Sequence, residues 1–147
     1  MVYHMSSNTG RPQIPQDMKS FNDKVIAEHR ANRGQLSGQL AQSKILLLTT
    51  TGAKSGKQRT TVVGYRRDGD RYVAIASNNG NDVAPKWFGN LLKHPEATIE
   101  VGPEKFEVSA RVATAEERPV FAKLIDYLER QQALTSREIP VVVLEPI

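Results

Sequence analysis

The 147-residue sequence contains no cysteine, which excludes disulfide bonds, thiol nucleophiles and cysteine-bound metal sites. Its three histidines, His4, His29 and His94, are too widely separated to assemble a metal-ligand set, so we predict no bound metal. The HExxH and GxSxG motifs of metalloproteases and serine hydrolases are missing as well. If the chain is an enzyme, its chemistry is therefore expected to belong to a bound organic cofactor.

Long hydrophobic runs and runs of like charge are also lacking. No segment is long enough to cross a bilayer, and no signal peptide with a clear apolar core is present. We therefore predict a cytoplasmic protein with at most a weak association with the inner face of the membrane. The net charge of +4 and the pI of about 9.5 favour an acidic ligand, whereas the scattered charges and the few aromatic residues argue against nucleic acid.

The first 16 residues contain Ser, Asn, Gly and Pro without an apolar period, and they predict a disordered N-terminal arm. Residues 17–147 form a single predicted domain that opens with a helix at about 20–33. Two more helices are predicted, one at 85–93 and one after a capping box formed by Thr114 and Glu117. Apolar runs predict strands at 45–51, 60–67, 71–77, 97–101, 105–112 and 141–144.

Short connections join most of these strands, and Asp68-Gly69 is a typical two-residue hairpin turn. Consecutive hairpins favour antiparallel pairing, because parallel pairs need long crossovers. Closure of the sheet would remove exposed edges in so small a domain. The predicted fold class is α+β, mainly β: a small, partly open barrel of about six largely antiparallel strands with helices packed outside.

The segment Leu46–Arg59 reads LLLTTTGAKSGKQR, a buried strand that breaks into a glycine-bounded loop and returns with an arginine. Only three residues separate its two glycines, and glutamine follows the second lysine, so it is not a Walker phosphate loop. A tight loop with cations, a hydroxyl and backbone N–H groups can nevertheless cradle an anion, and Arg59 adds a planar fork suited to phosphate or carboxylate. The alternative is an ordinary surface hairpin with solvated lysines.

Three further segments join this loop in resembling a known family: Ala76-Ser77, PKWFGNLLKHP at Pro85–Pro95 and REIPVVVLEP at Arg137–Pro146. Together they resemble the deazaflavin-dependent nitroreductase family of actinobacteria, over residues from about 45 to 147. The resemblance implies a split β-barrel that binds coenzyme F420, a 5-deazaflavin with a phosphate and an oligoglutamate tail. It also implies hydride transfer from the reduced cofactor to an electron-poor small molecule, namely a quinone, an enone or a nitro compound.

The same resemblance implies a set of cofactor-binding positions. The loop with Ala53, Lys54, Ser55, Lys57 and Arg59 is expected to hold the phosphate-bearing, acidic part of F420. The strand with Thr60, Thr61, Val62, Val63 and Gly64 runs along the cofactor, and the strand end with Ile75, Ala76, Ser77 and Asn78 approaches the deazaflavin. The helix with Lys86, Trp87, Phe88, Gly89 and Asn90 closes the site.

These residue types suit the ligand, because a polyanionic tail needs Lys and Arg donors and a planar ring needs an apolar slot with a few polar groups. Each position also has a purely structural alternative. Trp87 and Phe88 can be core anchors, and Asn90 can hydrogen-bond a loop. No catalytic residue is fixed by the sequence; Tyr65, Tyr127 and Ser77 are the candidates.

Two other functions stay open. A related split barrel would bind FMN or heme instead, and a non-enzymatic carrier would hold a fatty acyl chain in the apolar pocket. The segment Tyr127–Ser136 is shorter than its counterpart in nitroreductases and has a single tyrosine, so activation of nitroimidazole drugs is doubtful. We expect a small-molecule hydride acceptor as the partner, and either a monomer or a homodimer.

Overall fold

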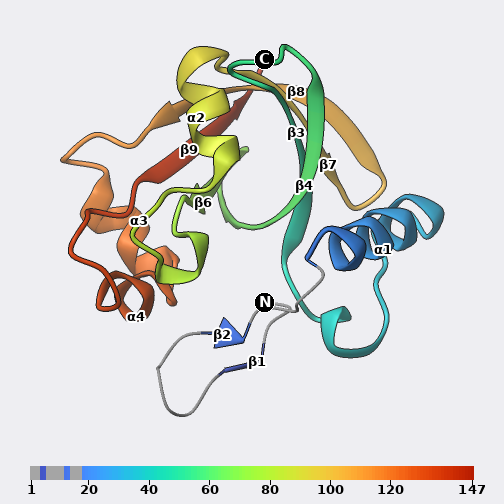
Figure 1. Ribbon diagram of the computed structural model, residues 1–147, viewed down its shortest axis with the longest axis horizontal. Helices are drawn as coiled ribbons and strands as arrows, with labels where there is room; N and C mark the ends of the chain where they lie inside the picture. Colours follow the sequence, from blue (N-terminus) through green and yellow to red (C-terminus); the bar gives the residue numbers. More distant parts are fainter. Residues whose placement is uncertain (1–3, 6–11, 14–17) are drawn as a thin grey trace.

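The computed structural model describes residues 4–5, 12–13 and 18–147, and its centre is one strongly curled sheet (Figure 1). All neighbouring strands of this sheet pair antiparallel, as the sequence predicts. Its seven strands lie in the order β4-β3-β7-β8-β9-β6-β5. They are β3 (Ile45–Thr51), β4 (Gln58–Gly64), β5 (Arg66–Asp68), β6 (Arg71–Ile75), β7 (Glu96–Val101), β8 (Glu104–Val112) and β9 (Val141–Pro146).

The two edge strands of the sheet, β4 and β5, are consecutive in the chain and are separated only by Tyr65. The sheet must therefore curl until its edges approach each other, and Figure 1 shows the chain curving from β4 around the open side of the barrel. The Tyr65 N–H bonds to the Lys44 carbonyl oxygen at 3.1 Å, which fixes this bend next to the start of β3. The predicted strand 60–67 is thus wrong as a single element, and the sheet has seven strands rather than six. The predicted split barrel is confirmed.

The hairpin between β5 and β6 turns one residue later than the sequence signal indicates. Asp68 pairs with Arg71, so the two turn residues are Gly69 and Asp70 instead of Asp68 and Gly69. Gly69 has a φ of +63°, a conformation that side-chain-bearing residues rarely adopt, and this places glycine at the first turn position.

Apolar side chains pack inside the barrel and, at β6 and β9, on the outer face of the sheet as well. The inner cluster fills the barrel and includes Leu46, Leu48, Tyr72, Ile99 and Leu144. An outer cluster joins β6 and β9 to the helices through Val73, Ile75, Val141 and Val143. Because β6 and β9 are buried on both faces, their sequences are continuous apolar runs rather than alternating ones.

Helix α1 (Met18–Ala31) lies against β4 on the outside of the barrel. It begins and ends two residues before the predicted range of 20–33. The chain leaves the helix through Arg33 and Gly34, both with positive φ, and the Gly34 N–H bonds to the His29 carbonyl oxygen at 2.8 Å. No helix in the described ranges is long and apolar enough to span a membrane.

Only two short pieces of the predicted N-terminal arm are described. β1 (His4–Met5) pairs antiparallel with β2 (Pro12–Gln13), and the rest of that arm lies outside the described residues. Between α1 and β3 the chain forms a single 3-10 turn, η1 (Gly38–Leu40).

The helix predicted after Thr114 is in fact two short helices, α3 (Arg118–Leu124) and α4 (Leu128–Gln132). The capping box is confirmed: the Glu117 N–H bonds to Thr114 Oγ1 at 3.1 Å, and the Thr114 N–H bonds to Glu117 Oε1 at 2.9 Å. The chain leaves helical geometry at Ile125, with a ψ of 87°. The bend allows Phe121, Ile125 and Leu128 to enter the same outer cluster.

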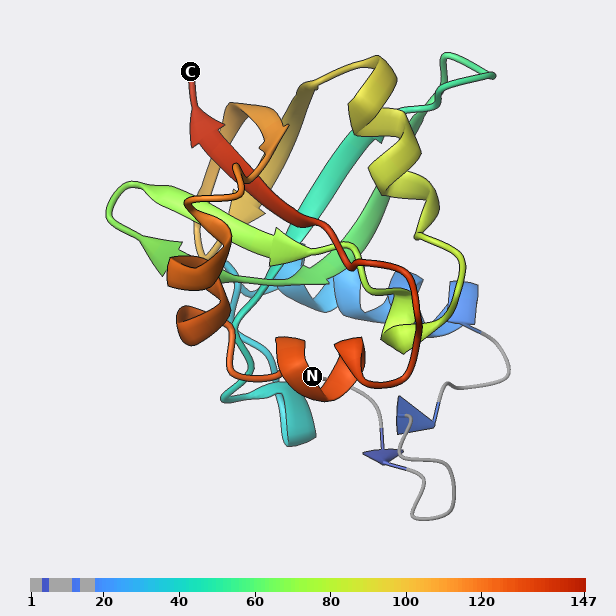
Figure 2. The same ribbon diagram turned by 90° about the vertical axis from the view of Figure 1, so that its left-hand side faces the viewer.

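An ion-pair network holds the start of α3 on the sheet. The Arg111 guanidinium on β8 forms two hydrogen bonds with the Glu117 carboxylate, at 2.6 and 2.9 Å, and a third with Glu145 on β9 at 3.0 Å. These charge-assisted bonds lower the pKa of Glu117 to about 2. Figure 2 shows α3 and α4 on the side of the barrel that β6 and β9 form. The network anchors the start of α3 there.

Gly34 is expected to be essential for the docking of α1. A Cβ atom at this position would lie 2.3 Å from the Gly102 Cα atom, and the residue has a φ of +86°. We predict that Gly34→Ala lowers the free energy of unfolding by about 2 kcal/mol, because backbone must move and a left-handed conformation is strained. Gly89→Ala is the control, since a Cβ there meets nothing within 4 Å, and urea unfolding should show it unchanged or slightly stabilised. Equal effects of both substitutions would contradict this account.

The Glu117 ion pairs predict a specific loss of stability in acid. The folded pKa of about 2 lies below the ordinary value of 4.5, so the stabilisation is complete above pH 4.5 and is lost as the pH falls towards 2. Glu117→Gln should therefore lower the thermal midpoint at pH 7, and the gap from wild type should close at low pH. Glu116→Gln should show no such gap, because Glu116 forms no ion pair with any residue in the described part of the chain.

Candidate functional site

A cavity of about 890 Å³ opens where the barrel is split, a volume suited to a planar cofactor ring and a second small molecule. Its walls come from the start of β3, from β4 and β5, from the end of β6, and from the α2 and α3–α4 regions. Helix α2 spans Lys86–Lys93. The lining residues are Asn22, Gln42, Ser43, Lys44, Ile45, Thr61, Val62, Val63, Gly64, Arg66, Ile75, Ser77, Asn78, Asn79, Pro85, Trp87, Asp126, Tyr127, Arg130 and Gln131.

The structure brings nine of the predicted site residues together around this cavity. They are Thr61, Val62, Val63, Gly64, Ile75, Ser77, Asn78, Trp87 and Tyr127. Four other predicted residues lie in or against packed protein: Ala76 is fully buried, Phe88 and Tyr65 pack against the inner cluster, and Thr60 Oγ1 lies 2.7 Å from Thr49 Oγ1. Tyr65 meets Tyr72 edge to face, at 5.6 Å between ring centroids.

The remaining predicted residues belong to the turn between β3 and β4 and to α2, which cover the upper part of the same face. Gly52 closes the turn, since its N–H bonds to the Lys57 carbonyl at 2.8 Å and a Cβ there would lie 2.5 Å from Ser55 Oγ. Ser55 Oγ in turn accepts the Lys57 N–H at 3.2 Å. The turn is therefore a compact, internally bonded loop rather than a loose one.

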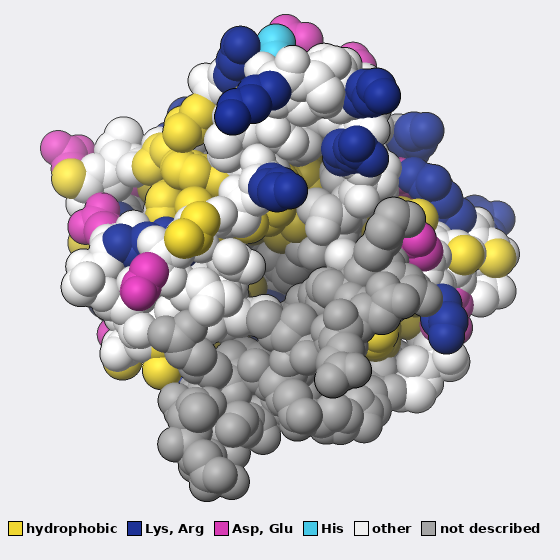
Figure 3. Space-filling view, viewed as in Figure 1, with side chains coloured by type: hydrophobic (Ala, Val, Ile, Leu, Met, Phe, Trp, Pro, Cys, Tyr) yellow, Lys and Arg dark blue, Asp and Glu magenta, His cyan; other side chains and the backbone are white. Residues whose placement is uncertain are grey.

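Positive charge gathers on this turn and on α2. Figure 3 shows Lys and Arg side chains spread over the part of the surface that these two elements form, above a hollow with apolar walls. The exposed cations of the two elements are Lys54, Lys57, Arg59, Lys86 and Lys93. None of the five forms an ion pair with a described residue, whereas Arg30, Arg66, Arg71 and Arg111 each have an acidic partner. Unpaired cations of this kind are available to an anionic ligand.

Asn90 holds the turn against α2. Its amide nitrogen donates to Thr50 Oγ1 at 3.0 Å, and its carbonyl oxygen accepts the Ala53 N–H at 3.0 Å. Both polar ends of the side chain are therefore occupied by the protein. Asn90 therefore hydrogen-bonds a loop, which is the structural alternative that the sequence left open, and it positions the cationic turn.

The end of β6 carries an unusual backbone. Ser77 has right-handed helical angles, whereas Asn78, Asn79 and Gly80 in the following turn η2 (Asn78–Gly80) all have positive φ. A right-handed residue followed by a left-handed one points successive N–H groups into one concavity. No described residue accepts a hydrogen bond from the N–H groups of Ser77, Asn78 or Asn79, and all three residues line the cavity. These groups are suited to the carbonyl oxygens of a ligand.

Arg137 fixes this strand end from behind. Its guanidinium donates to the carbonyl oxygens of Ala76, Ser77 and Asn81, at 3.1, 3.0 and 2.9 Å. Three bonds from one side chain explain how the strained turn keeps its shape.

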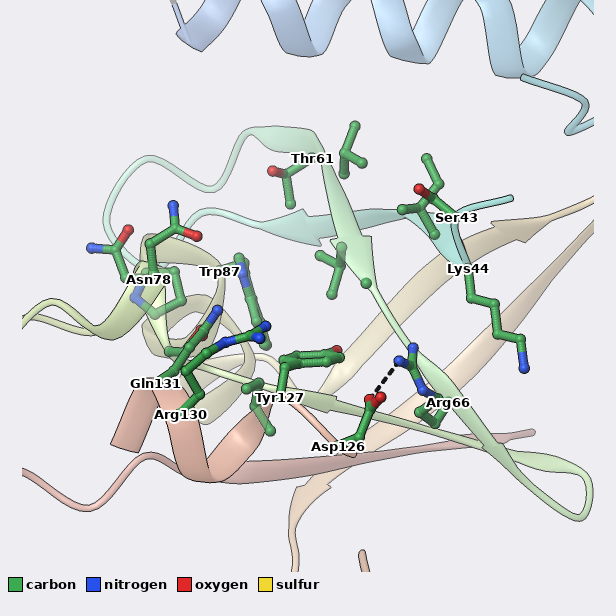
Figure 4. Close-up of a pocket in the computed structure, with 18 of the residues that line it drawn as sticks. Ser43, Lys44, Thr61, Arg66, Asn78, Trp87, Asp126, Tyr127, Arg130 and Gln131 are labelled. Atoms are coloured by element: carbon green, nitrogen blue, oxygen red, sulfur yellow. Dashed lines mark hydrogen bonds and ion pairs between the residues drawn. The ribbon is translucent and has the colours of Figure 1, made fainter. Parts of the chain in front are cut away.

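Tyr127 projects into the cavity from the α3–α4 bend, as Figure 4 shows. The Arg66 guanidinium carbon lies 5.1 Å from its ring centroid, and Arg66 is itself held by Asp126 at 2.8 Å. A Cβ at Gly64 would lie 3.4 Å from the Tyr127 hydroxyl, so glycine leaves room for that group beside β4. Burial raises the pKa of Tyr127, which keeps the hydroxyl protonated at neutral pH.

Sequence analysis did not identify eleven of the lining residues. They are Asn22, Gln42, Ser43, Lys44, Ile45, Arg66, Asn79, Pro85, Asp126, Arg130 and Gln131. Arg66 lay inside a predicted continuous strand and Asp126 inside a predicted helix, whereas Arg130 and Gln131 lay in the polar stretch that follows that helix. The polar run SNNGND at residues 77–82 was a detectable signal for Asn79, because successive asparagines favour left-handed turns.

The split barrel thus has a cavity with both apolar and polar walls, cations without ion-pair partners on the neighbouring surface, and open N–H groups at one end. These features suit a planar, anionic ligand. Comparison with known families places the chain more narrowly. The model of the F420H(2)-dependent quinone reductase family matches residues 23–146, and the chain belongs to this family. The deazaflavin-dependent assignment made from the sequence is thereby confirmed.

Individual relatives agree with this placement. The F420H(2)-dependent quinone reductase Rv1261c of Mycobacterium tuberculosis is 38% identical over 127 residues, which cover 80% of this chain and 85% of that protein. The solved structure of an F420-H2 dependent reductase (FDR-A) has a TM-score of 0.64 and 33% identity, and covers 69% of this chain and 94% of that one. A further structure, described as a domain-swapped dimer, has a TM-score of 0.64 and 28% identity, and covers 84% of this chain and 96% of that one.

The Asn90 brace can be tested by proteolysis. Asn90→Ala removes both hydrogen bonds that hold the β3–β4 turn, so the turn should open more often and expose its two lysines. We predict faster trypsin cleavage after Lys54 and Lys57, detected by mass spectrometry of the early fragments. Asn32→Ala is the control, because no described residue bonds to the Asn32 side chain. Identical early fragments at identical rates in the two variants would refute a bracing role.

Proposed function

We propose that this protein binds F420 with its acidic tail on the β3–β4 turn and its deazaflavin in the cavity, and that it reduces quinones with the reduced cofactor. The observation that carries this proposal is that five cations without ion-pair partners lie near a cavity that has apolar walls on β4 and α2 and unpartnered N–H groups at the end of β6. A polyanionic tail and a planar, carbonyl-bearing ring are the two parts of F420 that these features match.

The cations supply the tail site. Lys54 and Lys57 lie on one compact turn whose position Asn90 fixes, and Arg59 follows at the start of β4. Their charges are therefore held close together before a ligand arrives. Lys86 and Lys93 add charge from the neighbouring helix. The attraction of several cations to a phosphate and to glutamate carboxylates falls with salt, because these side chains are exposed.

The cavity supplies the ring site. Val62 and Trp87 offer apolar walls, and the N–H groups of Ser77, Asn78 and Asn79 offer hydrogen bonds to ring carbonyl oxygens. When bound, reduced F420 supplies a hydride from C5 of its central ring. The protein has to hold that ring in a fixed place. Arg137 contributes from outside the cavity, because it fixes the strand end whose N–H groups would bond to the ring.

Tyr127 is the best-placed group for the acceptor. Its hydroxyl lies beside β4 within the cavity, and its raised pKa makes it a neutral hydrogen-bond donor. Such a donor can polarise a quinone carbonyl and stabilise the negative charge that grows on its oxygen. Ser77 remains a second candidate on the opposite strand end. Tyr65 is less suitable because it packs in the inner cluster.

Binding of the cofactor can be separated into tail and ring parts. Titration with F420 should quench its fluorescence, and Lys54→Gln and Arg59→Gln should each weaken binding by about threefold to tenfold at low salt. The tailless 8-hydroxy-5-deazariboflavin should bind all variants equally. Lys123→Gln on α3 is the matched control, since this exposed lysine is not among the residues of the turn or cavity.

The alternatives give different results in the same assay. Equal affinity for FMN and F420 would favour a general flavin-binding barrel, and failure of both cofactors to bind would favour a carrier. A panel of quinones, enones and nitroaromatics with reduced F420 then sorts the acceptors. Oxidation of the cofactor by none of the quinones would overturn the proposed activity.

A further inference from the structure

Two adjacent glutamines at the end of α4 have the same side chain but different surroundings. Gln132 uses its whole amide within the protein: its oxygen accepts the Ile139 N–H at 2.8 Å, and its nitrogen donates to the Arg137 carbonyl at 2.6 Å. Arg118 adds a further bond to the same oxygen at 3.3 Å. Gln132 is therefore a structural connector between α4 and the segment before β9.

Gln131 has no comparable role. Its side chain is only 3% exposed, yet its Oε1 atom has no hydrogen-bond partner among the residues that the structure describes. A buried carbonyl oxygen without a donor is costly, and proteins usually satisfy such groups. An apolar side chain of similar size would be the more stable choice at this position if it served packing alone.

Gln131 borders the cavity next to the strand end that carries the open N–H groups. Figure 4 shows it with Asn78 and Arg130 at one end of the cavity. The distance between α4 and η2 is fixed, since a Cβ at Gly80 would lie 3.1 Å from the Gln131 carbonyl oxygen and 2.8 Å from a Leu134 methyl. The Gln131 side chain and the N–H groups of Asn78 and Asn79 therefore belong to one rigid polar end of the cavity.

We propose that Gln131 is the residue that recognises the imide edge of the deazaflavin ring, accepting a hydrogen bond from its N3–H. This inference rests on the proposed function, because it deepens the ring site of F420. The imide edge presents a carbonyl, an N–H and a second carbonyl in a row. It needs one acceptor between donors. Among the described residues that line the cavity, Gln131 is the only one with a buried side-chain acceptor that has no hydrogen-bond partner.

The geometry of glutamine allows this pairing. Its terminal torsion is broad and roughly two-fold, so the amide can turn its oxygen towards a ligand without any shift of α4. The amide nitrogen then lies next to the oxygen and can donate to one of the two ring carbonyls of the imide edge. The N–H groups of Ser77–Asn79 can donate to the second carbonyl. Gln131 would thus be a cofactor-recognising residue rather than a structural one.

The test uses the tailless 8-hydroxy-5-deazariboflavin and its N3-methyl derivative, so that the β3–β4 turn does not contribute. Gln131→Met keeps the length of the side chain and removes its polar atoms. We expect the variant to bind the unmodified ring about tenfold more weakly and the N3-methyl ring as wild type does. Wild type should discriminate against the N3-methyl ring, and the variant should not.

Gln132→Met is the matched control. It should lower the thermal midpoint, because four hydrogen bonds are lost, and leave the affinity ratio of the two rings unchanged. Gln131→Met should leave the midpoint unchanged or raise it. If methionine is not accommodated, Gln131→Leu, which is shorter, is measured in the same way.

Three outcomes would overturn the inference. In Gln131→Met they are an equal fall in affinity for both rings, no fall in affinity for either ring, and a rise in the quinone KM without a change in affinity for the rings. The last would make Gln131 part of the acceptor site. If wild type binds neither ring nor intact F420, the proposed function itself fails, whereas wild-type binding that is insensitive to Gln131 leaves the proposed function intact.

Discussion

The bend at Tyr65 is the constraint on which the rest of the structure depends. Because β4 and β5 are one stretch of chain at opposite edges of the sheet, the sheet has to curl, and its split stays open at the bend. The hydrogen bond from the Tyr65 N–H to the Lys44 carbonyl holds that position. Gly64 and Arg66, on either side of the bend, both line the cavity, so the opening in the barrel and the site are the same feature.

The second wall of the cavity is brought in from the far end of the chain. The Arg111–Glu117 pair and the capping box fix the start of α3, and the outer apolar cluster fixes its inner face. After the bend at Ile125, Tyr127 lies beside Gly64 of β4 and Gln131 lies beside η2. Each ion pair adds little to the free energy of unfolding. Together they nevertheless matter for the cavity, because they position α3, a short helix with little stability of its own.

Charge is divided between two roles in this molecule. Arginines that hold elements together are paired with carboxylates or carbonyl groups, as in Arg66, Arg111 and Arg137. The cations of the β3–β4 turn and of α2 have no acidic partner in the described part of the chain, and they face outward above the cavity. A basic composition alone does not separate these roles. The distinction is made by which side chains the fold brings within reach of a carboxylate.

The sequence alone determined most of the strands, the antiparallel pairing, the capping box and the basic turn, because these depend on residues close together in the chain. It did not show that residues 60–67 divide between two strands. Its motif spacing was enough to indicate the family and half of the cavity lining. Tertiary structure decided the split at Tyr65, the break at Ile125 and the grouping of Arg66, Tyr127 and Gln131, which are up to 65 positions apart in the chain. It also showed that Asn90 braces a loop and that Gln131, unlike Gln132, has an unpartnered oxygen. Such distinctions depend on which groups meet across the barrel, and local sequence patterns carry no information about those contacts.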